Sequence, residues 1–456
     1  MYKKIDAALA ALQPAMVDTL AKWIRIPSEK LAPEPGAPFG KPMHEMLTVA
    51  LADAQSLGMR THDFEGYIGE AEIGAGDETM GILAHLDIVP AGDGWQVDPF
   101  GALIENGKMF GRGTSDDKGP AVAALYAMKA VLDAGVPLNK KVRLILGCDE
   151  ESGWDDIRHY KTQRQMPDFG FSPDGMYPLI NTEKGILQVA LQGDMTPGGS
   201  LTVYTAAAGQ RPNVIPGEAT AEIAAPDFQA LQAQLAATGL AVSAESLGEG
   251  RAKLISHGAA GHAAFPEGGK NAAVQLLLAL KALGAGGAIA RLGEGVGMDA
   301  TGAGFGVSGR DEVSGALTMN LGILRIENGR LTAMLDIRHP VLMSAEAITK
   351  MIDLKLTGTG VRARIQEAKG PLHVPADHPL VGALLAVYRE ETGDDSGPIA
   401  IGGGTYARSM ENCVAFGASF PNTPDLAHQA GENIPLAELY LNARIIAHAI
   451  ARLAGA

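Results

Sequence analysis

The feature that most constrains the fold is an alternation of apolar runs and helical segments between Thr79 and Tyr177. The run "TMGILAHLD" is almost continuously apolar, which is typical of a strand covered on both faces. A helix is expected to begin at "DDKGP", with Pro120 in its first turn, and to end near Gly135. The run "KVRLILGCDE" then predicts another buried strand. Strands that alternate with helices favour an α/β layer with a mostly parallel sheet.

The middle of the chain has a different pattern, which predicts a second domain. A chain of 456 residues can form two cores, because single cores stop growing near ~250–300 residues. The stretch "ALTMNLGILRIENGRLTAMLDIRHP" is expected to form a long hairpin that turns at Asn328-Gly329, between helical segments. We therefore expect a first domain built from residues 1–184 and 371–456. Residues 185–370 would form an inserted α+β domain with an antiparallel sheet.

Composition and charge exclude several classes of protein. The formal net charge of −15 argues against a nucleic-acid partner, which would require a basic face. The two cysteines, Cys148 and Cys413, are too few for a disulfide framework and favour a cytoplasmic protein with reduced thiols. The most apolar segment, "VQLLLALKALGAGGAIA", is interrupted by Lys281 and by glycines, so no membrane span is expected. The N-terminal segment predicts an amphipathic helix rather than a signal peptide.

Five glycine-rich turns carry carboxylates or imidazoles. They contain His85 with Asp87, Asp116 with Asp117, Glu150 with Glu151, and the single residues Asp174 and His428. Each turn alone has an ordinary structural explanation, such as turn chemistry, helix capping or a solvated loop. Together they form a set of ligands without cysteine, which suits a catalytic zinc site better than a structural one.

The opening pair of this set predicts a metal ligand together with the group that orients it. His85 and Asp87 are two residues apart at the end of a strand, so their side chains share a face. Asp87 can then bond one ring nitrogen of His85 while the other nitrogen binds a metal. Charge balance favours two divalent cations, because a single ion would leave a buried surplus of negative charge among the carboxylates.

These stretches resemble the co-catalytic zinc aminoacylase/carboxypeptidase G metallopeptidase superfamily, and within it the PepV-type dipeptidases, also called Xaa-His dipeptidases. The matching stretches occur in the family's order and span almost the whole chain: "HLDIVPAGDGW", "GRGTSDDKGP", "DEESG", "FSPDG", "GHAAFPEGGKNA", "DIRHP", "AIGGGTYAR" and "AHQAGEN". The resemblance implies a catalytic zinc-peptidase domain with a mixed, mostly parallel sheet and an inserted lid domain. It also implies a monomer that acts on a small peptide substrate.

The resemblance implies two zinc ions per chain, for which manganese or cobalt could substitute. Their implied ligands are His85 and Asp174 for one ion, Glu151 and His428 for the other, and Asp116 as the bridge, with Asp117 as the neighbour most easily mistaken for it. The peptide bond that follows Asp116 is expected to be cis. Glu150 would be the general base, and Asp87 the carboxylate behind His85.

The resemblance also assigns substrate-binding residues to the lid. His262 would stabilise the oxyanion, with Asn213 close to it. Arg338 would bind the substrate's free carboxylate as a bidentate pair, although it could instead pair with Asp336 on the same strand face. The backbone of the glycine run would receive that carboxylate as well; the run is Gly402, Gly403 and Gly404.

Three functions are compatible with these residues. The first is a dipeptidase that releases a C-terminal amino acid from substrates with a free N-terminus. The second is a deacylase of N-acetyl or N-succinyl amino acids, and the third is a non-catalytic, metal-dependent peptide-binding protein. The lid and the "AIGGGTYAR" segment favour the dipeptidase, and the presence of Glu150 argues against the non-catalytic alternative.

Overall fold

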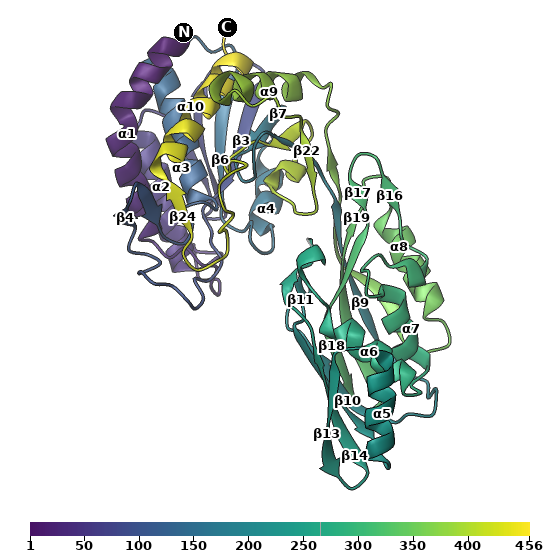
Figure 1. The fold of residues 1–456 in the computed structure, drawn as a ribbon. Coiled ribbons are helices and arrows are strands. Elements are labelled where there is room, and N and C mark those ends of the chain that lie inside the picture. Colours follow the sequence, from purple (N-terminus) through teal and green to yellow (C-terminus); the bar gives the residue numbers. More distant parts are fainter. Residues whose placement is uncertain (265) are drawn as a thin grey trace. The chain divides into compact units, whose positions relative to one another are not determined.

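The computed structural model describes residues 1–264 and 266–456, which form two compact units. The first unit comprises Met1–Asn181, Val374–Ile399 and Thr405–Ala456. The second unit comprises Thr182–His373 and Ala400–Gly404, so it consists mainly of one segment inserted into the first. Both ends of the chain lie in the first unit (Figure 1).

A mixed sheet forms the centre of the first unit, with the strand order β1-β2-β6-β3-β7-β23-β8-β21 and with β22 paired to β8. Its strands are β1 (Arg60–Phe64), β2 (Ile68–Gly74), β3 (Thr79–His85), β6 (Lys141–Gly147), β7 (Phe169–Ser172), β8 (Ile180–Glu183), β21 (Leu372–His373), β22 (Ile399–Ile401) and β23 (Cys413–Ala415). The neighbouring strands β6, β3, β7 and β23 are parallel, whereas β1, β2 and β21 pair antiparallel. This confirms the expected α/β class with a parallel central region.

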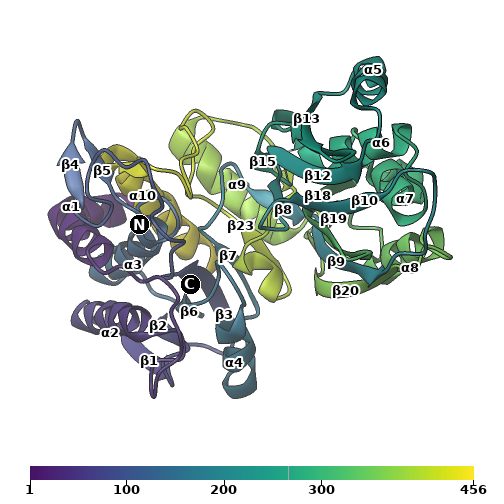
Figure 2. The ribbon, with the colours of Figure 1, turned by 90° about the horizontal axis from the view of Figure 1, so that it is seen from below.

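Helices cover the sheet of the first unit. They are α1 (Tyr2–Ile24), α2 (Lys41–Ser56), α3 (Lys118–Asp133), α4 (Asp155–Gln163), α9 (Pro379–Thr392) and α10 (Leu436–Leu453). Helix α3 is buried along most of its length and packs on β3 and β6, while α1 and α10 pack on α3 (Figure 2). A smaller sheet joins β4 (Leu103–Glu105), β5 (Lys108–Phe110) and β24 (Asn433–Pro435), and its β4–β5 hairpin turns at Asn106-Gly107.

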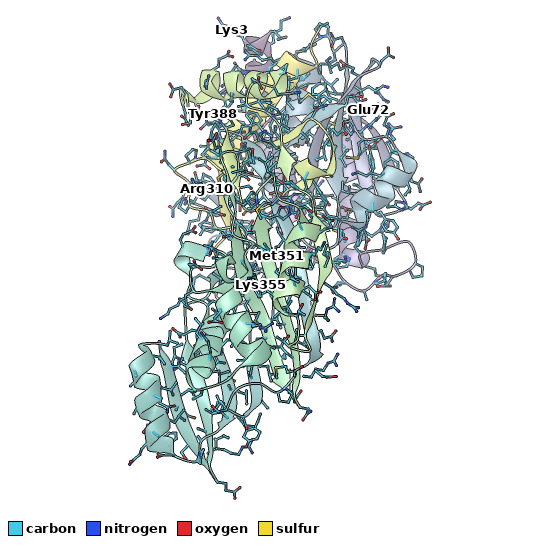
Figure 3. All side chains as sticks on the ribbon, turned by 90° about the vertical axis from the view of Figure 1, so that its right-hand side faces the viewer. Lys3, Glu72, Arg310, Met351, Lys355 and Tyr388 are labelled. Atoms are coloured by element: carbon cyan, nitrogen blue, oxygen red, sulfur yellow. The ribbon has the colours of Figure 1, made fainter. Side chains whose placement is uncertain are left out.

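The second unit is an antiparallel sheet with helices on one face (Figure 1). Its strands, in their order across the sheet, are β13 (Val242–Gly248), β14 (Arg251–His257), β12 (Glu218–Ala224), β10 (Val203–Ala208), β18 (Thr318–Glu327), β19 (Arg330–His339), β9 (Gly185–Asp194) and β20 (Arg362–Lys369). Its helices are α5 (Phe228–Thr238), α6 (Ala272–Ala282), α7 (Gly287–Val296) and α8 (Ala345–Lys355), the last of which carries Met351 and Lys355 (Figure 3). The predicted hairpin at Asn328-Gly329 is confirmed as β18–β19.

Short elements complete the second unit and the connections. These are β11 (Val214–Ile215), which pairs with β15 (Gly261–His262), β16 (Arg310–Asp311), which pairs with β17 (Gly315–Ala316), and the 3-10 turns Pro266–Gly268, Ala303–Phe305 and Tyr406–Ser409. Across residues 1–264 and 266–456, no helix has both the length and the apolar character that crossing a membrane requires.

Candidate functional site

The parallel strands of the first unit bring the predicted metal ligands to one edge of its sheet. Strand β3 ends at His85, and Glu150 follows the end of β6 at Gly147. Asp174 follows the end of β7 at Ser172. Because the carboxyl ends of parallel strands meet at one edge, residues far apart in the sequence converge there.

Asp116 lies between two histidines and faces each of them with a different oxygen. Its Oδ1 lies 3.0 Å from Nε2 of His85, and its Oδ2 lies 2.9 Å from Nε2 of His428. The same nitrogen of His428 lies 2.8 Å from Oε1 of Glu151, and Nε2 of His85 lies 3.8 Å from Oδ2 of Asp174. Asp116 thus connects His85 and Asp174 on one side with Glu151 and His428 on the other.

These contacts define two groups of side chains that could each hold a cation. The ligand atoms of His85, Asp116 and Asp174 lie within 4.8 Å of one another, and so do those of Asp116, Glu151 and His428. Imidazole nitrogens and carboxylate oxygens without cysteine are the donor set of catalytic zinc sites. The residues therefore fit a pair of divalent cations that share the carboxylate of Asp116.

The electrostatic environment of this cluster favours positive charge. Burial alone would lower the pKa of His428, but hydrogen bonds to Asp116 and Glu151 raise it to about 11. Burial, reinforced by the negative charge of Asp116, raises the pKa of Asp174 to about 7. For Asp116 itself, the two histidines outweigh the effect of burial and hold the pKa far below its usual range. The imidazoles thus stabilise the charged form of Asp116, as bound metal ions would, whereas Asp174 lies among negative charge that a cation would offset.

The backbone oxygen of Asp87 orients the ring of His85, and the carboxylate of Asp87 holds the loop that carries Glu150 and Glu151. Nδ1 of His85 lies 2.9 Å from the backbone oxygen of Asp87 and 3.4 Å from its Oδ1. A proton on Nδ1 leaves the lone pair of Nε2 facing Asp116. The two oxygens of Asp87 accept the backbone N–H groups of Glu150 and Glu151, at 3.1 and 3.0 Å. Asp87 therefore fixes the loop that carries both glutamates.

Among the residues that the structure describes, Asp117 and Glu150 are acidic neighbours of the candidate ligands that belong to neither group. Asp117 is fully buried, and its Oδ2 accepts the backbone N–H of His85 at 3.0 Å. The geometry thus separates Asp117 from Asp116, and the bond between them is cis, as expected. Burial raises the pKa of Glu150 well above its usual value. Its carboxyl group interacts electrostatically with His85, Asp174 and Glu151, but it is not one of the donors in either group.

Other groups that fix these loops were not identified from the sequence. The buried Asp156 accepts the backbone N–H groups of Cys148 and Asp149, at 2.7 and 3.0 Å, and the hydroxyl of Tyr406 donates to it. Nζ of Lys118, also buried, donates to the backbone oxygens of Trp23 and Ile26. Lys118 lies within the quoted motif "GRGTSDDKGP" and Asp156 shortly after "DEESG", but both have charged neighbours in the sequence, so no local pattern indicated that they are buried. For Tyr406, the only indication in the sequence was its place in the quoted segment "AIGGGTYAR".

The second unit brings Asn213 and His262 together. Strands β11 and β15 pair Val214 with His262, and the backbone N–H of Ala263 donates to the backbone oxygen of Asn213 at 2.9 Å. Nδ2 of Asn320 donates to the backbone oxygens on both sides of Asn213, those of Pro212 and Val214, at 2.8 and 3.0 Å. The side chain of Asn320 thus fixes the loop beside His262.

Arg338 and the glycine run also lie close together in this unit. Arg338 is buried, and its Nε and Nη2 donate to the two carboxylate oxygens of Asp336, at 2.7 and 3.2 Å. Its Nη1 donates to the backbone oxygen of Gly402 at 3.2 Å. A Cβ atom placed on Gly402 would lie 3.1 Å from the backbone oxygen of Ala264, so the run containing Gly403 and Gly404 begins beside the His262 segment. The pairing with Asp336 is therefore confirmed, and carboxylate binding stays a prediction, for which Arg338 has further N–H groups at its tip.

A groove of about 950 Å³ lies elsewhere in the first unit. Its lining includes Lys140, Asp168 and Asn412, which precede strands β6, β7 and β23. It therefore lies at the amino ends of the parallel strands, opposite to the edge that carries the ligands. None of the residues proposed for catalysis or metal binding lines it.

Comparisons with known proteins identify the family. Residues 81–452 match the model of peptidase family M20/M25/M40. The chain is 37% identical to YtjP of Bacillus subtilis strain 168 over 435 residues, which cover 92% of each chain. It is 35% identical to the Beta-Ala-Xaa dipeptidase of Lactobacillus delbrueckii subsp. lactis over 428 residues, covering 91% of this chain and 90% of that protein.

Solved structures share the fold at lower sequence identity. Human carnosine dipeptidase 1 matches with a TM-score of 0.63 and 17% identity, over 99% of this chain and 98% of that one. The aminoacylhistidine dipeptidase of Vibrio alginolyticus matches with a TM-score of 0.60 and 16% identity, over 98% and 99% of the two chains. The family match spans the strands, turns and helices that carry the ligand groups. This chain is therefore a member of the M20/M25/M40 peptidase family.

Proposed function

We propose that this protein is a metal-dependent dipeptidase, which hydrolyses the amide bond of dipeptides with a free N-terminus and releases the C-terminal amino acid. The observation that carries the proposal is the position of Asp116, whose two oxygens face two separate groups of ligands. The Beta-Ala-Xaa dipeptidase relative supports this class of substrate.

The proposed ligands divide between two zinc ions. His85 and Asp174 would hold one ion, Glu151 and His428 the other, and Asp116 would contact both. Bound there, the ions would supply Lewis acidity, which activates a water molecule and polarises the scissile carbonyl. Manganese or cobalt could substitute, because these ligand types accept all three metals.

Glu150 would transfer the protons of the reaction. Its carboxyl group interacts electrostatically with His85 and Asp174, and the carboxylate of Asp87 accepts its backbone N–H. Glu150 would accept a proton from the attacking water and then donate it to the leaving amine nitrogen, a role commonly worth ~10²–10⁴ in rate.

The second unit would contribute residues that recognise the substrate. His262, beside Asn213, would donate to the developing oxyanion, an interaction commonly worth ~3–4 kcal/mol. The N–H groups at the tip of Arg338 would bind the C-terminal carboxylate of the dipeptide, together with the backbone of the run Gly402, Gly403 and Gly404. Asp336 would hold the guanidinium in place for this role. A cytoplasmic location and a monomeric state are further parts of the proposal.

A hydrolysis panel with zinc-loaded protein tests the reaction. Free dipeptides, including β-alanyl and Xaa-His dipeptides, should be cleaved with a higher kcat/KM than N-acetyl or N-succinyl amino acids. The reverse order would make the protein a deacylase. Zinc binding without turnover of either class would make it a non-catalytic binding protein.

The variant Glu150→Gln tests the catalytic assignment separately. It should retain its fold and its zinc content while losing about 10²–10⁴-fold in kcat. Glu105→Gln, which changes an exposed glutamate in β4, is the matched control and should keep full activity. Unchanged turnover in Glu150→Gln would remove this residue from its proposed role.

A further inference from the structure

A buried ion pair lies outside the set of proposed ligands. Nη1 of Arg112 lies 2.5 Å from Oε2 of Glu432, and both side chains are almost completely inaccessible to solvent. Burying two charges is costly unless further hydrogen bonds satisfy them. The partners of each group therefore indicate what the pair does.

The carboxylate of Glu432 holds the segment that leads into Asp116. Its Oε1 accepts the backbone N–H groups of Gly113, Ser115 and Asp116, at 2.9, 3.0 and 3.3 Å. The hydroxyl of Ser115 donates to the same oxygen at 3.1 Å. One buried carboxylate thus fixes three peptide groups of the segment that ends at Asp116, the candidate ligand that both groups share.

The guanidinium of Arg112 connects this segment to two other loops. Its Nη2 donates to the backbone oxygen of Ala91 at 3.1 Å, in the loop that follows His85 on β3. Its Nη1 also approaches the backbone oxygen of Gln429, the residue after His428, at 3.5 Å. The guanidinium lies over the ring of Trp95, 5.4 Å from its centroid. The ion pair therefore joins the three loops that carry His85, Asp116 and His428.

A comparable pair in the same unit shows what a purely structural role would look like. Arg143 and Glu72 are also buried, and Nη2 of Arg143 lies 3.0 Å from Oε2 of Glu72 (Glu72 is labelled in Figure 3). These two residues lie within β6 and β2, and their partners include Tyr160 and Arg60 rather than the ligand loops. Disturbing them should affect stability alone.

We propose that Arg112 and Glu432 are positioning residues for the metal centre, and that their pairing sets the separation of the ligands on its three loops. This inference rests on the proposed metal-dependent function. Partners that orient metal ligands typically account for about 10–100-fold in metal affinity. The substitution Glu432→Gln preserves the shape of the side chain but removes the charge opposite Arg112. It also weakens the acceptor for the N–H groups before Asp116.

The experiment measures the affinity of the folded, metal-free protein for zinc ions by competition with a chromophoric chelator. Glu432→Gln should bind zinc about 10–100-fold more weakly than the unsubstituted protein. Glu72→Gln makes the same chemical change in the comparison pair and should bind zinc normally, although both variants should unfold at a lower temperature. Equal zinc affinity in the two variants, whether normal or weakened, would overturn the positioning role.

A second variant covers the case in which Glu432→Gln does not fold. Arg112→Lys keeps a positive charge opposite Glu432 but loses the planar fork that reaches Ala91 and Gln429. Its turnover should fall at limiting zinc and recover in excess zinc, whereas a loss that excess zinc does not restore would contradict the inference. If the unsubstituted protein itself bound no zinc, the proposed function would fail. If Arg112→Lys and Glu432→Gln both bound zinc with normal affinity, the proposed function would stand and only the positioning role of Arg112 and Glu432 would be rejected.

Discussion

Replacing Asp87 by asparagine changes one buried group that supports two neighbouring residues proposed to act in the site, Glu150 and Glu151. The carboxylate accepts the backbone N–H of Glu150 with one oxygen and that of Glu151 with the other. Asparagine offers one oxygen and one NH₂ group, so one of the two backbone N–H groups would face a donor. Asparagine has nearly the same size and shape as aspartate, so the substitution changes mainly these hydrogen bonds.

The size of the effect follows from the buried setting of Asp87, which is 1% exposed. Leaving a buried N–H group without an acceptor costs about 1–3 kcal/mol. The metal-free protein should therefore lose about 1–3 kcal/mol of unfolding free energy. If the loop relaxes to satisfy that N–H group, Glu151 moves away from His428, and the same free energy corresponds to about 5–150-fold in zinc affinity.

Two measurements on the same samples check this prediction: urea unfolding of the metal-free protein and zinc competition. Asp311→Asn is the matched control, because Asp311 in the second unit also accepts backbone N–H groups, from Val313, Ser314 and Leu342. Asp311→Asn should lose stability with unchanged zinc affinity, whereas Asp87→Asn should lose both. A destabilised Asp87→Asn protein with normal zinc affinity would refute the claim that Asp87 fixes the loop of Glu151.

Other predictions concern recognition, stability and the lid loop. Arg338→Lys keeps a charge beside Asp336 and should raise KM by about tenfold or more for free dipeptides but not for their C-terminal amides; an equal rise for both would exclude carboxylate binding. Although burial alone would raise the pKa of Glu72, hydrogen bonds from arginines lower it below its ordinary value of 4.5. The ionised Glu72 should therefore stabilise the fold fully above pH 4.5, and this stabilisation should disappear as the pH falls through the lowered pKa. In acid, chemical unfolding should then give the same stability for Glu72→Gln and the unsubstituted protein. A difference in stability that persisted in acid would contradict this prediction. Asn320→Leu removes two donors to the loop of Asn213 and should lower kcat while zinc affinity is unchanged; unaltered kcat would exclude this support.

The first sheet could be predicted in part, because its central strands have local signatures. Strands β3 and β6 are continuous apolar runs, and parallel pairing then places their end residues together. Strand β2 was not predicted, since Glu70 and Glu72 interrupt its apolar pattern. In the fold these two carboxylates are buried and pair with Arg143, which comes from a neighbouring strand about 70 residues later, and with Arg60 and Arg164. A local pattern contains no information about such a partner.

The candidate site shows the same division between local and long-range information. Its ligands could be proposed because each lies in a recognisable turn, and the fold brings them together. The supporting pair of Arg112 and Glu432 was missed, although both residues lie inside the quoted motifs "GRGTSDDKGP" and "AHQAGEN". They are 320 positions apart, and only burial distinguishes their interaction from that of two solvated charges.

The measurement that most directly tests the proposed dinuclear centre is anomalous X-ray scattering at the zinc edge from crystals of the zinc-loaded protein. Two peaks should appear in the first unit, one beside His85 and Asp174 and the other beside Glu151 and His428, with an oxygen of Asp116 next to each. A single peak at full zinc loading, or peaks away from these side chains, would contradict the shared-carboxylate centre from which the proposed chemistry follows.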